Sequence, residues 1–171
     1  MERTTWPGSG LSGLLDRALA LLDRPGRAIL GIAGAPASGK STLAAHVLAD
    51  LERQRPGRVV GVGMDAFHIG HRVLERRGLT EIKGAPETFD VIGFIHLLQR
   101  IRTETGPIYA PEFAREIEDS LAHVTEIDDR VRLVIVEGNY LLLNLEPGPA
   151  YARCSTRPGS CTWTTRSGAG G

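Results

Sequence analysis

Eight consecutive residues, GAPASGKS at positions 34–41, limit the fold of this chain more than any other part of its sequence. They match the pattern G-x-x-x-x-G-K-[ST] of a phosphate-binding P-loop at every fixed position. The glycines let the backbone wrap closely round a phosphate, and successive amide groups and a helix N-terminus point at the anion. The residues expected to bind nucleotide are Gly34, Ala35, Pro36, Ala37, Ser38, Gly39, Lys40, Ser41 and Thr42.

The segments around this motif have the structure that a P-loop requires. Residues 28–33 form an apolar run typical of a buried strand, and residues 41–53 carry apolar side chains at helical spacing. A second apolar run at 59–64 completes a strand–helix–strand unit, so we expect the second strand to lie beside the P-loop strand. An amphipathic helix over 11–22 is expected to cover the sheet.

The later part of the chain continues this alternation. The sequence predicts a helix over 91–102, short strands at 108–110 and 121–127, and a third buried strand at 131–136. The segment between the second strand and this helix, 65–90, is polar, and α/β proteins place their sites after strand ends. The pattern therefore predicts an α/β fold with a parallel sheet.

Four residues can carry the chemistry of a bound nucleotide. Lys40 can neutralise the β- and γ-phosphates of ATP, and the Ser41 hydroxyl can ligate Mg²⁺. Asp65 ends the second strand, where a carboxylate can accept the proton of an attacking hydroxyl, although a turn or capping aspartate fits the position equally well. Glu137 ends the third strand and can hold Mg²⁺ through water or orient a nucleophile, with a surface acid as the alternative.

Other polar residues carry weaker signals. The run KGAPETFD at 83–90 indicates a turn followed by a helix capped by Thr88 or Asp90. The segment 109–118 can bind a substrate, but a solvated surface is the better interpretation from chemistry alone. His68 and His71 have i, i+3 spacing without a third ligand at suitable spacing, so we do not expect a metal site there.

Composition narrows the remaining classes of function. The formal net charge is zero, which argues against a nucleic-acid-binding domain. The sequence has no apolar run of membrane-spanning length and no secretory pattern at its start, so the expected location is cytoplasmic. A disulfide between Cys154 and Cys161 would be unusual in that reducing compartment.

The order of the motifs resembles one group of P-loop kinases, which includes pantothenate kinase, uridine kinase and phosphoribulokinase-like enzymes. The chain is most similar to bacterial proteins called nucleoside/nucleotide kinase family or fructose-transport-type kinases, over about residues 11–143. The stretch at 83–90 looks like K-G-x-P-E-S-Y-D of bacterial pantothenate kinases. The motifs that carry the resemblance are GAPASGKS, MDAFH, KGAPETFD, YAPEFAR and VIVEGNYLLL.

This resemblance implies a P-loop NTPase fold with helices on both faces of the sheet. It also implies that Asp65 is the catalytic base, that Lys40 and Ser41 grip ATP·Mg²⁺, and that Glu137 helps to place the metal. The residues that it places around the acceptor pocket are His68, Lys83, Tyr109 and Arg115.

The sequence departs from this group at its C-terminus. Residues 146–171 lack periodicity and are rich in Gly, Pro, Ser and Thr, so they are expected to be an irregular, disordered tail. The last strand and the arginine-bearing lid of the group are not recognisable, and a genuine truncation and a frameshift after about Leu145 both stay open. We therefore expect an incomplete kinase domain over 1–145, with the strand at 131–136 short of a neighbour, marginal stability and poor turnover.

Two functions fit these observations. The first is an ATP-dependent small-molecule kinase whose acceptor is a pantothenate-, nucleoside- or sugar-like alcohol. The second is a P-loop protein that binds nucleotide with little or no turnover because of the C-terminal truncation. A GTPase or transport ATPase is disfavoured because the chain has neither N-K-x-D nor L-S-G-G-Q. The sequence does not identify the acceptor, and it leaves a homodimer open.

Overall fold

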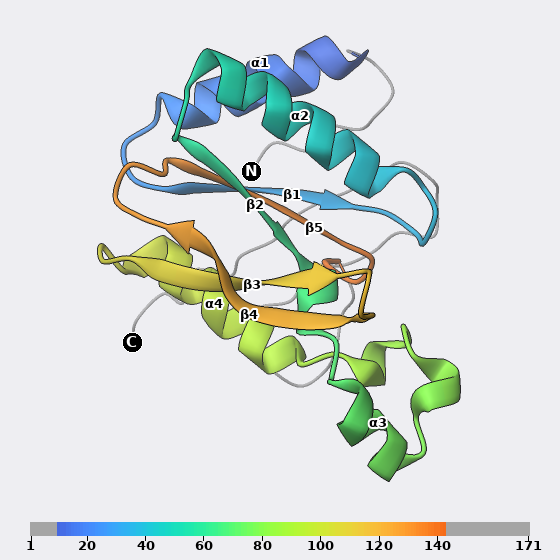
Figure 1. Ribbon diagram of the computed structural model, residues 1–171. Helices are drawn as coiled ribbons and strands as arrows, with labels where there is room; N and C mark the ends of the chain where they lie inside the picture. The colour runs from blue at the N-terminus through green and yellow to red at the C-terminus, as the bar shows by residue number, and fades with distance from the viewer. Residues whose placement is uncertain (1–9, 143–171) are drawn as a thin grey trace, which may run out of the picture.

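The computed structural model describes residues 10–142 of the chain (Figure 1). Its regular elements alternate between helix and strand before an antiparallel hairpin interrupts the order. The helices and strands are α1 (Gly10–Leu22), β1 (Ala28–Ala33), α2 (Lys40–Gln54), β2 (Val59–Gly63), α3 (His71–Arg77), α4 (Val91–Thr103), β3 (Ile108–Ala114), β4 (Asp119–Ile127) and β5 (Leu133–Gly138). Three short 3₁₀ helices, η1 (Met64–Phe67), η2 (Thr80–Ile82) and η3 (Pro86–Thr88), lie between β2 and α4.

Strands β1, β5 and β2 form a parallel sheet in that order. Ala33 pairs with Gly138 on one side of β5, and Gly63 pairs with Glu137 on the other. The prediction that β2 lies beside the P-loop strand is therefore wrong, because β5 lies between them. Residues 133–136 of β5 are all buried, which suits the central position, where a strand has a neighbour on each side.

Helices cover both faces of this sheet, as the sequence predicts (Figure 1). On one face, α1 and α2 pack against the sheet through a cluster that includes Ala18, Val47 and Leu133. On the other face, α4 and the β3–β4 hairpin close a second cluster, which includes Ile101 and Val134. Because both faces of the sheet are buried, the side chains on both sides of each strand are apolar. The strands therefore appear in the sequence as continuous apolar runs and not as alternating apolar and polar residues.

The hairpin is longer than the two short strands that the sequence predicts. Strands β3 and β4 pair antiparallel from Ile108 and Ile127 to Ala114 and Asp119, with a register shift between Ala110 and Glu112. Pro111 lies at this shift, because a proline has no backbone N–H to donate to the ladder. The hairpin therefore extends the YAPEFAR segment as a strand towards the carboxyl end of β2.

The polar segment 65–90 contains more regular structure than its composition indicates. It holds η1, the short helix α3 and two further 3₁₀ turns. Of the two predicted caps of the next helix, Asp90 has this role, because its side chain accepts a hydrogen bond from the Gly93 N–H at 2.9 Å. Thr88 is fully buried and instead bonds within its own turn, to Gly84 and Ala85.

The expectation that the third buried strand lacks a neighbour is also wrong, since β5 has β1 on one side and β2 on the other. The predictions of a disordered tail at 146–171 and of a missing last strand and lid concern residues outside the described range 10–142, and so does a disulfide between Cys154 and Cys161, which is possible but would be unusual in a reducing compartment. Within that range no helix is long and apolar enough to cross a membrane.

Candidate active site

The P-loop joins β1 to α2 in a backbone conformation that only small residues allow. Gly39 has φ 81°, and a Cβ atom on Gly34 would lie 2.5 Å from the Ser38 Oγ. The N-cap residue of α2, Gly39, makes no side-chain hydrogen bond to the first turn. The backbone N–H groups at the start of this helix therefore have no capping side chain. The turn is held by a hydrogen bond from the Ser38 N–H to the Ala35 carbonyl at 3.2 Å. These are the features that an anion-binding helix N-terminus requires.

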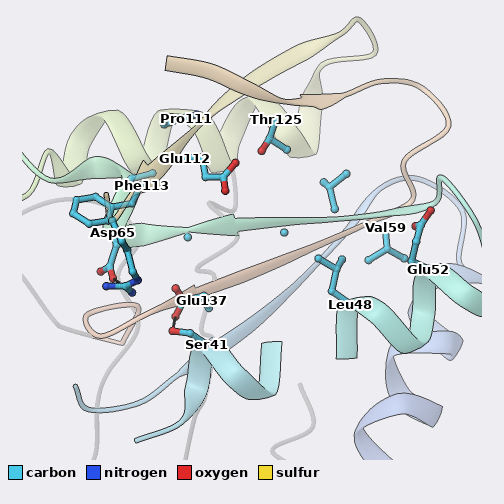
Figure 2. Close-up of a pocket in the computed structure, with 15 residues that line it drawn as sticks. Ser41, Leu48, Glu52, Val59, Asp65, Pro111, Glu112, Phe113, Thr125 and Glu137 are labelled. Atoms are coloured by element: carbon cyan, nitrogen blue, oxygen red, sulfur yellow. Dashed lines mark hydrogen bonds and ion pairs between the residues drawn. The ribbon is translucent and has the colours of Figure 1, made fainter. Parts of the chain in front are cut away.

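The end of β5 brings Glu137 next to this loop. The Ser41 hydroxyl donates a hydrogen bond to Glu137 Oε2 at 3.1 Å (Figure 2). On the opposite side, a Cβ atom on Gly63 would lie 3.3 Å from Glu137 Oε1, so this glycine leaves room for the carboxylate. The central position of β5 therefore places Glu137 between the P-loop and the end of β2.

The environment of Glu137 raises the pKa of its carboxyl. Burial raises the pKa of its carboxyl above the ordinary value, and the nearby Asp65 carboxylate raises it further. Lys40, the hydrogen bond from Ser41, and Arg115 act in the opposite direction and lower this pKa, but they do not cancel the rise. A cation bound beside Glu137 would offset both causes of the rise, which is the electrostatic property expected of a metal-holding carboxylate.

Asp65 lies in η1, directly after β2, and is mostly shielded from solvent. Arg115, just after β3, reaches it with Nη2 at 3.8 Å from Asp65 Oδ2. The Arg115 side chain is 69% exposed, whereas that of Asp65 is 21% exposed. The Asp65 carboxylate therefore lies mostly within the protein, whereas its cationic partner, Arg115, lies at the exposed edge of the site.

Three predicted acceptor residues surround one ring that the sequence analysis did not single out, Phe113. The centre of this ring lies 5.4 Å from the imidazole of His68, 5.6 Å from the Lys83 Nζ and 5.9 Å from the Arg115 guanidinium. His68 also lies with Nδ1 2.8 Å from the carbonyl oxygen of Asp65. Phe113 is one of two aromatic residues in YAPEFAR, and the sequence does not distinguish it from Tyr109; only the contacts show its central place.

Tyr109 lies apart from this cluster. Its side chain is 47% exposed, its backbone pairs with Glu126, and its ring contacts His123 with the ring centres 6.3 Å apart. The structure thus brings His68, Lys83 and Arg115 together near Asp65 and places Tyr109 on the outward face of the hairpin.

A cavity of about 500 Å³ opens from this edge of the sheet (Figure 2). The wall at the sheet edge includes Ser41, Asp65 and Glu137, and Phe113 and Arg115 close it from the hairpin. The cavity is large enough for a small-molecule ligand. The arrangement places the last residue of the P-loop, Ser41, a candidate metal-holding acid, Glu137, and a candidate base, Asp65, around a single space.

Comparison with a solved structure decides the family. The chain is 40% identical to a protein described as a "putative fructose transport system kinase" from Silicibacter sp. TM1040, with a TM-score of 0.71 over 81% of this chain and 68% of that one. The chain belongs to the P-loop kinases. Their pantothenate kinase and uridine kinase group, which the order of the motifs predicts, also contains its sequence relatives.

Two relatives of this P-loop kinase show the breadth of that group. It is 37% identical over 146 residues to "Putative uridine kinase C227.14" of Schizosaccharomyces pombe, and 36% identical over 124 residues to a pantothenate kinase of Lacticaseibacillus casei. These alignments cover 81% and 72% of this chain, but 62% and 40% of the relatives. No protein-family model matches the chain.

The site of this kinase fits ATP and Mg²⁺. The uncapped start of α2 and the Gly34–Ser38 approach suit a phosphate group, and the Ser41 hydroxyl and the Glu137 carboxylate are oxygen ligands of the type that Mg²⁺ prefers. In the described residues 10–142, no group of three or more His, Cys, Asp or Glu side chains forms a metal site by itself. His71 Nε2 lies 3.3 Å from Glu75 Oε1.

Proposed function

We propose that this P-loop kinase transfers the γ-phosphoryl group of ATP to a hydroxyl group of a small pantothenate-, nucleoside- or sugar-like acceptor. The observation that supports this proposal most directly is the convergence of Ser41, Glu137 and Asp65 on one cavity at the carboxyl edge of the sheet. Its family membership supports phosphoryl transfer in general, and the two relatives' names differ in the acceptor.

The P-loop would bind the phosphates of ATP. The backbone N–H groups at the start of α2 point towards the β- and γ-phosphates, and Lys40 neutralises their charge. Mg²⁺, when bound, supplies further charge neutralisation to these phosphates. Ser41 would hold it directly, and Glu137 would hold it through water or directly.

Asp65 would act as the base for the acceptor. Its carboxylate accepts the hydroxyl proton while the acceptor oxygen forms a bond to the γ-phosphorus. The bond between that phosphorus and the β–γ bridging oxygen breaks, and ADP leaves with the electron pair. Catalysis in this scheme comes mainly from positioning and charge neutralisation, because the protein forms no covalent bond with the phosphoryl group.

His68, Lys83 and Arg115 would contact the acceptor around Phe113. Each lies within 6 Å of that ring centre, and Arg115 also reaches the proposed base. Tyr109 lies on the outward face of the hairpin. It would contact the acceptor only if the conformation of the hairpin changed.

The experiment is a transfer assay with the 171-residue protein, ATP, MgCl₂ and separate samples of pantothenate, uridine and fructose. Mass spectrometry of the acceptor is expected to show a gain of one phosphoryl group for at least one compound, and none with Lys40→Ala. Nucleotide binding without a phosphorylated acceptor would favour the alternative, a nucleotide-binding protein with little or no turnover.

A further inference from the structure

The cavity at the reaction centre continues well beyond the residues that the proposed reaction needs. It follows β2 from Gly63 back to Val59, which is four residue steps, or about 13 Å at the rise of a β-strand. We call the part of the cavity beyond Asp65 and Phe113 the distal groove. Its far part is lined by residues 59–61, Leu48, Glu52 and Thr125, and Pro111 and Glu112 line the part nearer to Phe113. In Figure 2, Asp65 and Phe113 lie at one end of the cavity, and Val59 and Glu52 lie at the other.

The floor of the distal groove is the outer edge of a strand. Strand β2 pairs with β5 on one side, and within residues 10–142 no strand pairs with its other side. A free strand edge presents backbone N–H and C=O groups. Leu48 of α2 and Pro111 of the hairpin add apolar walls, and a Cβ atom on Gly61 would already touch Leu48 at 3.4 Å. An amide or hydroxyl group on an apolar chain matches this lining.

The charge of the distal groove has one sign. Glu52 lines its far end from α2, and Glu112 lies over β2 nearer to Phe113, as Figure 2 shows. Among all the lining residues of the cavity, the single cationic side chain is Arg115, which lies at the opposite end, 3.8 Å from Asp65. The Glu52 carboxylate accepts a hydrogen bond from the Gly57 N–H at 2.7 Å, and none of the ion pairs found between residues 10 and 142 involves it. An anionic group in this part of the cavity would therefore be repelled.

We infer that the acceptor is an elongated alcohol whose tail lies in the distal groove and is uncharged or cationic. The reacting hydroxyl lies at Asp65, and the rest of the molecule runs along the free edge of β2 towards Glu52. This inference rests on the proposed function, since it assigns the acceptor of the same site. It disfavours acceptors with a carboxylate or phosphate at the end remote from the reacting hydroxyl.

The test compares pantothenate with pantothenol, which share the reacting hydroxyl. At the remote end of the molecule, pantothenate has a carboxylate and pantothenol has a hydroxyl. Calorimetry with the 171-residue protein, MgCl₂ and a non-hydrolysable ATP analogue measures the affinity for each compound. We expect pantothenol to bind about five- to tenfold more tightly at low ionic strength, with a smaller preference at high salt. Glu112→Lys should reverse the preference, and Glu112→Gln should reduce it.

A matched control is Glu116→Gln, which removes an exposed carboxylate of the β3–β4 turn that does not line the cavity. It should leave the preference unchanged. Equal affinities, tighter binding of pantothenate, or no binding of either compound would overturn the inference. A preference for pantothenol without transfer when ATP replaces the analogue would retain the inference about the groove and refute the proposed kinase reaction.

Discussion

The Tyr140 hydroxyl donates a hydrogen bond to the backbone carbonyl of Gly84 at 2.8 Å, across 56 positions of sequence. Tyr140 follows the strand that carries Glu137, and Gly84 follows Lys83. Gly84 has φ 103°, a conformation that favours glycine, so a residue with a side chain would be strained in this turn. The bond thus ties the carboxyl end of β5, near Glu137, to the loop that holds Lys83.

Loss of this bond should weaken acceptor binding more than nucleotide binding. We expect Tyr140→Phe to raise the acceptor KM by about three- to tenfold, with the affinity for ATP unchanged and stability lower by about 1 kcal/mol. Steady-state kinetics and thermal melts measure these quantities. Tyr109→Phe is the control, since Tyr109 is exposed on the hairpin. A parallel loss of ATP affinity would show that Tyr140 acts on the whole fold instead.

Lys40 should dominate the affinity for ATP. Removing its ammonium group deletes a charge-assisted contact worth about 1.5–3 kcal/mol, so Lys40→Ala should weaken ATP·Mg²⁺ binding about ten- to a hundredfold. Calorimetry of both proteins with ATP and MgCl₂ measures this change, and a matched melting curve shows whether the variant is folded. Equal affinity in a folded variant would refute the assignment of the nucleotide site.

Asp65→Asn should lower the rate of phosphoryl transfer without weakening ATP binding. The amide is nearly the same size but cannot accept the hydroxyl proton as a base, so turnover should fall at least about a hundredfold. The affinity for ATP should change little, because Asp65 lies after β2 and not in the P-loop. Single-turnover measurements with saturating acceptor give the rate, and unchanged turnover would place the base elsewhere.

Glu137 should make the nucleotide-free protein less stable as pH rises. Its pKa is raised in the folded state by burial and by Asp65, so protonation favours folding. This contribution is fully present below the ordinary glutamate pKa and is lost as pH rises through the raised pKa. Glu137→Gln is always neutral, so the melting temperature of the variant should exceed that of the wild type by an amount that grows with pH.

The measurement is a series of thermal melts with a chelator present, from about pH 4 to about pH 8. Glu116→Gln is the control for removal of one exposed carboxylate. With MgCl₂ the same Glu137→Gln variant should bind ATP more weakly than the wild type. A difference in melting temperature that does not change with pH would contradict the raised pKa.

The sequence by itself determined the features that depend on residues close together along the chain. The P-loop is one continuous run, so its glycines, its Lys40 and its Ser41 were predictable from spacing alone. The apolar runs at 28–33 and 59–64 and the helix from Val91 were predictable for the same reason, since burial and helical spacing are local patterns.

The tertiary structure decided which of these elements are neighbours. The adjacency of strands 28–33 and 59–64 in the sequence led to a wrong strand order, because the most buried strand, β5, occupies the centre of the sheet and lies between them. The gathering of His68, Lys83 and Arg115 round Phe113, and the bond from Tyr140 to Gly84, join residues from separate segments of the chain. No local pattern records such contacts, since they exist only after the hairpin and the sheet have packed against each other.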